Sequence, residues 1–172
     1  MSEKTKVFVA YVLQRISSGG DTGFSAKLRR ADNQDTEYQS WEILSKWVDL
    51  ENEKERKAYG LIAASLAKGT IENDGIGSIG VALRRSFFAK ATGEDIVKST
   101  ECSRLQRLLS CRDSFELLGI LRSLLRYLDA KGIDYSRVQL LDEILWFDST
   151  NQRDRIRAGW AQGFFRKEGD AE

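Results

Sequence analysis

The chain has 172 residues, 41% of them hydrophobic and 31% charged, with a formal net charge of +1. These values fit one globular domain or two small ones and exclude a globally basic or low-complexity protein. The chain has no histidine and no proline, so it lacks the usual proton shuttle near neutral pH, and continuous helices are favoured over strands and turns.

Apolar residues in the first 70 positions recur at helical spacing. They predict a helix over 4–17, a short helix capped by Asp21 or Thr22, a third from Trp41 to Val48, and a fourth over 51–68. The fourth opens with acidic residues and closes at Lys68-Gly69, as the helix dipole favours.

The second half continues the helical pattern after a polar loop at 72–75. Helices are expected from Ser78, from Ser99 or Thr100, from Asp113 to about Ala130, from Asp134 to near Phe147, and from Asp148 or Ser149 to about Lys167, with a short segment after Thr92. We therefore predict an all-α protein, a compact helical bundle forming one domain over 1–172. Two half-bundles, 1–98 and 99–172, are the alternative.

Residues 75–80 match the dinucleotide-binding fingerprint G-x-G-x-x-G letter for letter. That motif needs a parallel strand leading into the glycine turn, whereas here a helix and a polar loop precede it. A flexible entry into a helix with a close-packing face of small residues is the better interpretation, and no cofactor is expected.

Catalytic chemistry has little support in this sequence. The adjacent carboxylates Asp142-Glu143 and Glu94-Asp95 point in different directions on a helix. Without histidine, a serine nucleophile has no obvious base. Cys102 and Cys111 have no partner ligands, so two buried thiols are expected rather than a zinc site or a disulfide scaffold. We therefore expect a protein that is not an enzyme, with no catalytic residue and no bound metal. A metal-dependent nuclease is the alternative.

Arginine carries the strongest signal, because twelve of the sixteen arginines lie between Arg84 and Arg166. Arg122 and Arg126 are four apart in an otherwise apolar helix, and Arg104 and Arg107 are three apart. In the last helix, a stripe at i, i+4, i+7 and i+11 joins basic to aromatic residues. Its members are Arg153, Arg157, Trp160 and Phe164. Guanidinium groups grip phosphate without reading bases, so we predict nucleic-acid binding without sequence preference.

The order of motifs resembles the small subunit of the type I-E CRISPR surveillance complex, Cascade (the CasB family). The segments that carry this resemblance are 26–32, 78–83, 104–109, 121–128, 140–146 and 155–161. The resemblance implies an all-helical, non-catalytic subunit, present as a pair and contacting the backbone and large subunits. It also implies contacts with CRISPR RNA and with the target and displaced DNA strands, which would stabilise the R-loop.

The predicted site follows from the arginine pattern and this resemblance. The expected nucleic-acid-binding residues are Lys27, Arg29, Arg30, Arg84, Arg85, Arg104, Arg107, Arg122, Arg126, Arg153, Arg155 and Arg157. Trp160, Phe164 and Phe165 are expected at a subunit interface.

A second hypothesis stays open, namely a structural helical adaptor that bridges subunits and touches no nucleic acid. Three acidic residues, Asp32, Asp35 and Glu37, lie close to the first basic cluster and favour it. One contiguous arginine stripe would favour nucleic-acid binding, whereas arginines paired with local carboxylates would favour the adaptor. No apolar run reaches the length of a membrane span and no signal-peptide pattern is seen, so we expect a cytoplasmic protein without membrane contact.

Overall fold

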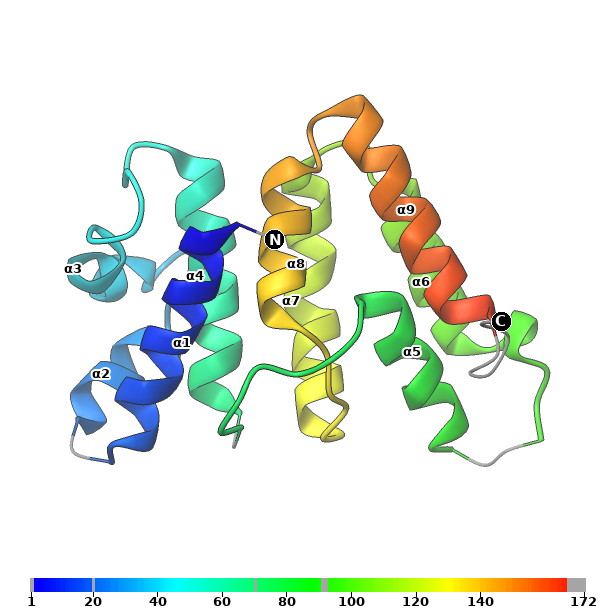
Figure 1. Ribbon diagram of the computed structural model, residues 1–172, viewed down its shortest axis with the longest axis horizontal. Coiled ribbons are helices and arrows are strands. Elements are labelled where there is room, and N and C mark those ends of the chain that lie inside the picture. Colours follow the sequence, from blue (N-terminus) through cyan, green and yellow to red (C-terminus); the bar gives the residue numbers. More distant parts are fainter. Residues whose placement is uncertain (1, 20, 70, 91–92, 167–172) are drawn as a thin grey trace. The chain divides into compact units, whose positions relative to one another are not determined.

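A computed structural model describes residues 2–19, 21–69, 71–90 and 93–166, and within these ranges every regular element is a helix (Figure 1). The all-α prediction is confirmed. The expected helix end at Lys167 and the segment start at Thr92 lie outside the described residues. The chain divides into two compact units, each built from two stretches of sequence. Unit 1 comprises Met1–Asp74 with Arg137–Leu145, and unit 2 comprises Gly75–Ser136 with Trp146–Glu172. That the two form one domain stays a prediction.

Unit 1 has an aromatic centre on its first helix. Its elements are α1 (Glu3–Ser17), α2 (Thr22–Leu28), the 3₁₀ turn η1 (Glu37–Ser40), α3 (Trp41–Leu44), α4 (Glu53–Lys68) and most of α8 (Arg137–Trp146). The buried Phe8 ring meets Trp47 and Tyr59 edge-on, at centroid distances of 5.3 and 4.7 Å. Asp21 caps α2 as predicted, accepting a hydrogen bond from the Phe24 N–H at 2.9 Å. These contacts join α1, α2 and α4 in one core.

The predicted third helix is shorter than expected, because α3 ends at Leu44 rather than Val48. The hydroxyl groups of Ser40 and Ser45 donate to the carbonyls of Glu37 and Glu42, at 2.7 and 3.3 Å. Such local bonds compete with the helical ladder, so the segment breaks into short turns.

The start of α8 also differs from the prediction, since α8 begins at Arg137 and not at Asp134. The N–H groups of Arg137 and Val138 donate to the Asp74 carboxylate, at 2.7 and 3.3 Å. Asp134 instead accepts from the Ile76 N–H at 3.2 Å. The cap of α8 thus comes from a residue far away in the sequence, which local spacing does not reveal.

Unit 2 contains the other helices of the described chain. They are α5 (Ile79–Phe88), the 3₁₀ turn η2 (Ile96–Lys98), α6 (Thr100–Ser110), α7 (Ser114–Ala130) and α9 (Thr150–Phe165). Ser78, Ser99 and Asp113 cap α5, α6 and α7 as expected, each accepting a backbone N–H bond in the first turn. Ser149 precedes α9. Asp148 instead accepts from the Ser114 N–H and hydroxyl, at 2.7 and 2.8 Å, and so supports the start of α7.

The glycine motif of unit 2 is explained by close packing and backbone geometry. A Cβ atom added at Gly80 would lie 1.9 Å from the Trp160 carbonyl oxygen, so α5 and α9 cross at this point. A Cβ atom at Gly75 would meet the Asp134 carboxylate at 1.9 Å, and Gly77 has a φ of +100°. Each glycine therefore has a local structural reason.

Candidate nucleic-acid interface

Unit 2 carries a groove between α6 and α7. Its volume is 170 Å³, and its lining comprises Arg104 and Arg107 from α6 with Ile120, Ser123, Leu124 and Tyr127 from α7. The four α7 positions follow an i, i+3, i+4, i+7 spacing and so share one face of the helix. We call these six residues the α6–α7 groove.

The two arginines of the groove, Arg104 and Arg107, differ in their surroundings. The Arg104 guanidinium lies over the Tyr127 ring at 3.7 Å, and its buried Nη1 atom has no hydrogen-bond partner. The Lys131 ammonium lies 5.3 Å from the same ring. Arg107 is exposed, and its side chain forms no hydrogen bond or ion pair with the described residues. The groove therefore presents positive charge, and Arg107 has donors available to an anion.

A buried polar network holds Tyr127 in place behind the groove. The Tyr127 hydroxyl donates to Glu101 at 2.8 Å and lies 2.9 Å from the Ser86 hydroxyl. The Glu101 side chain is fully buried and pairs with the Lys90 ammonium at 2.6 Å. Burial alone would raise the pKa of Glu101, but the hydrogen bonds from Lys90 and Tyr127 outweigh it and bring that pKa below its ordinary value.

Replacing Glu101 by glutamine should lower the free energy of unfolding by about 3 kcal/mol at pH 7, because Lys90 loses its partner. Since the pKa of Glu101 is lower in the folded state, its contribution is present above the ordinary glutamate pKa. That contribution is lost as the pH falls through the folded value. Urea unfolding of both proteins between pH 7 and pH 3 checks this: the difference should shrink in acid, and a difference independent of pH would contradict it.

Arg122 and Arg126 do not line the α6–α7 groove. They follow Ile120 and Leu124 by two residues, which turns them to another face of the helix. Arg122 is half-buried and Arg126 is exposed. The predicted arginine pairs of α6 and α7 are thus not joined in this groove.

Several other predicted arginines of unit 2 donate to backbone carbonyl groups. Arg84 bonds to Phe164 O at 3.0 Å, Arg85 to Ile76 O at 2.7 Å, Arg153 to Arg112 O at 2.5 Å, and Arg157 to Cys111 O. Arg157 also pairs with Asp154 at 3.7 Å, and Arg155 is exposed. A carbonyl bond fixes a guanidinium without neutralising it, so Arg84, Arg85 and Arg153 support the fold and still contribute positive charge.

The predicted cations near the N-terminus belong to unit 1. Lys27 pairs with Glu42 at 2.5 Å, and Arg30 donates to the Gln39 side chain. Arg29 donates to Ala67 O at 2.9 Å, near the end of α4. Lys27 is thus neutralised locally, while Arg29 and Arg30 keep their charge.

The predicted interface aromatics fall into two groups. Trp160 and Phe164 are fully buried, and Trp160 stacks on Phe147 at a centroid distance of 5.9 Å. The stripe predicted on α9 therefore faces the interior of the protein, which differs from the expected surface position. Phe165 is 47% exposed and is accessible to a partner.

Sequence reasoning missed Ser123, Tyr127 and Lys131. Tyr127 orients Arg104, and Lys131, the residue just after α7, has its ammonium 5.3 Å from the same ring. The four-residue spacing of these three positions was a usable signal. Arg122 and Arg126, on another face of the same helix, gave a stronger sequence signal than this spacing did.

The described residues also bear on metal binding, on membrane insertion and on the two cysteines. No three histidine, cysteine, aspartate or glutamate side chains in this part of the chain gather as they would to hold a metal ion. None of its helices is long and apolar enough to cross a membrane. Cys102 and Cys111 are free and buried as expected, and burial raises the pKa of both thiols.

Comparison with known proteins gives a family match. The family model described as CRISPR-associated protein Cse2 matches residues 25–165, which is most of the chain. That range includes both α6 and α7 in full. No curated protein and no solved structure gives a significant match.

Proposed function

The chain belongs to the CRISPR-associated Cse2 family, and from this membership we propose that it holds nucleic-acid backbone in a type I-E Cascade complex as a non-catalytic small subunit. Its other partners would be the backbone and large subunits and a second copy of the chain. By holding CRISPR RNA or the target and displaced DNA strands, it would stabilise the R-loop while guide pairing supplies sequence specificity.

The α6–α7 groove is the observation that carries this proposal. Its size of 170 Å³ suits a phosphate group with part of a sugar, and is below the range of pockets that enclose a drug-sized ligand. The exposed side chain of Arg107 has donors free for a phosphate oxygen, and the Arg104 guanidinium adds positive charge beside it. A site that grips phosphate and leaves the bases outside carries no sequence information.

The structural adaptor stays the second candidate. It is favoured by the arginines that bond to carbonyl groups of unit 2 itself, such as Arg84 and Arg153. Under this alternative the cations would support the fold and meet only protein partners.

Binding of the purified chain to two labelled single-stranded DNAs of equal length and unrelated sequence separates these functions. We expect fluorescence anisotropy at low salt to give affinities within about threefold of each other, because phosphate contacts dominate. A preference of about a hundredfold would indicate base reading and contradict the proposal. No binding to either DNA would contradict it too, and would favour the adaptor.

A further inference from the structure

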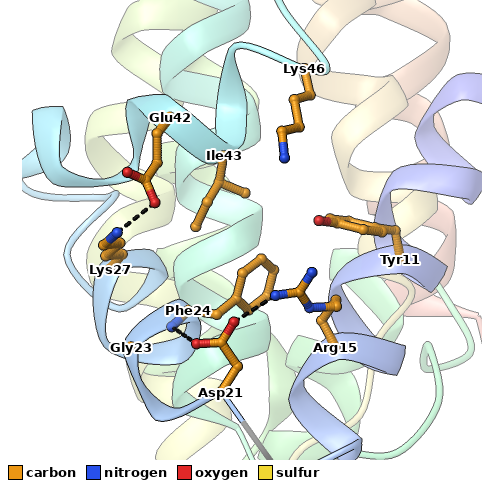
Figure 2. A pocket seen from close by; sticks show the side chains of 9 residues that line it. All are labelled: Tyr11, Arg15, Asp21, Gly23, Phe24, Lys27, Glu42, Ile43 and Lys46. Atoms are coloured by element: carbon orange, nitrogen blue, oxygen red, sulfur yellow. Dashed lines mark hydrogen bonds and ion pairs between the residues drawn. The ribbon is translucent and has the colours of Figure 1, made fainter.

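Unit 1 contains a pocket of 290 Å³ bounded by α1, α2 and the α3 segment (Figure 2). Phe24 and Ile43, which are 5% and 6% exposed, give it an apolar wall. The Tyr11 hydroxyl and the Lys46 ammonium point towards the space from two different segments, Tyr11 from α1 and Lys46 from the stretch after α3 (Figure 2). This pocket is separate from the α6–α7 groove, and its role does not depend on the function proposed above.

Two of the three cations at the pocket are neutralised by local carboxylates. Arg15 pairs with Asp21 and Lys27 with Glu42, both at 2.5 Å (Figure 2). The Phe24 N–H and then Arg15 hold the pKa of Asp21 below its ordinary value, so this carboxylate stays charged at neutral pH. These two ion pairs occupy the lower and left-hand walls in the view of Figure 2.

Lys46 and Tyr11 differ from these pairs. Neither side chain forms a hydrogen bond or an ion pair with the described residues. The Tyr11 ring is held by Phe24 and Trp47, at centroid distances of 6.0 and 5.3 Å, which fixes the direction of its hydroxyl. The pocket thus holds two free donors, and Lys46 gives its lining one unbalanced positive charge.

We propose that this pocket receives one acidic side chain of a partner protein, with an apolar residue beside it. Lys46 and Tyr11 would bind the carboxylate, while Phe24 and Ile43 would contact the apolar neighbour. A single charge matches the single unbalanced cation. A nucleic-acid strand fits less well, because its successive phosphates would approach Asp21 and Glu42.

The matched dipeptides N-acetyl-leucyl-glutamyl amide and N-acetyl-leucyl-glutaminyl amide test this proposal on the full chain. Titration followed by ¹H–¹⁵N spectra should give saturable shifts of the Gly23 and Lys46 amides with the glutamyl probe, at a dissociation constant of about 1 mM. The glutaminyl probe should bind at least about fivefold more weakly, since it offers no charge to the ammonium.

Lys46→Gln should reduce affinity for the glutamyl probe about five- to tenfold, and Tyr11→Phe should reduce it by a smaller factor. Lys98→Gln removes an exposed lysine of unit 2 and should leave binding unchanged. Equal binding of both dipeptides, or no saturable shift up to about twentyfold above the expected constant, would overturn the proposal. Displacement of the glutamyl probe by single-stranded DNA would overturn it in favour of a nucleic-acid site.

Discussion

Replacing Arg104 and Arg107 together by alanine should weaken single-stranded DNA binding about tenfold to a hundredfold. Each guanidinium is expected to contribute about 1 kcal/mol or more through a charge-assisted contact with phosphate. The free energy of unfolding should change little, because Arg107 is exposed and Arg104 contributes mainly its contact with the Tyr127 ring. Anisotropy titration and urea unfolding of the same preparation measure both quantities.

The matched control is Arg112→Ala. Arg112 is 85% exposed and pairs with Glu116 at 2.6 Å, so its charge is already balanced outside the groove. We expect this variant to bind DNA within about twofold of the parent. An equal loss in the control and the double variant would mean that total charge, rather than the groove, governs binding. A large loss of stability in the double variant would instead make Arg104 and Arg107 structural residues.

Gly80→Ala should strongly destabilise unit 2. The new Cβ would lie 1.9 Å from the Trp160 carbonyl oxygen, and its nearest neighbours are all backbone atoms. Since backbone cannot move aside as a flexible side chain does, α5 and α9 must separate. We expect a loss of about 3 kcal/mol or more in the free energy of unfolding, read from urea denaturation.

Gly119→Ala, in the same unit, should have the opposite effect on the free energy of unfolding. Gly119 is exposed within α7, and a Cβ added there meets nothing within 4 Å. Alanine should therefore stabilise the protein by about 0.5–1 kcal/mol, because it lowers the entropy of the unfolded chain. Similar effects of the two substitutions would contradict the close crossing of α5 and α9.

Local patterns were sufficient to predict most helices and several of their caps. Ser99 and Asp113 accept the first-turn N–H bonds that their positions indicated, because an N-cap interaction depends only on residues two or three apart. Local rules failed for α8, where Asp74 supplies the cap from 63 residues away. Spacing also placed the basic and aromatic stripe of α9 on one face, but it could not show that Trp160 and Phe164 on that face are buried within unit 2.

The candidate site was predicted less completely than the fold. Arg104 and Arg107 were identified as a pair, but spacing alone gave them the same weight as Arg122 and Arg126. Separating these pairs needs the packing of α6 on α7, which selects one face of each helix. The polar network behind Tyr127 needs three-dimensional contacts as well, because Ser86 and Glu101 come from different helices.

The most direct test is the salt dependence of single-stranded DNA binding, measured for the parent chain and for the Arg104→Ala/Arg107→Ala variant. If the groove holds phosphates, log affinity should fall linearly with log salt, with a slope of about −0.7 per phosphate contact. Removing both arginines should make that slope shallower by about 1.4. An unchanged slope, or the absence of binding by the parent chain at low salt, would contradict a nucleic-acid-holding role for the α6–α7 groove.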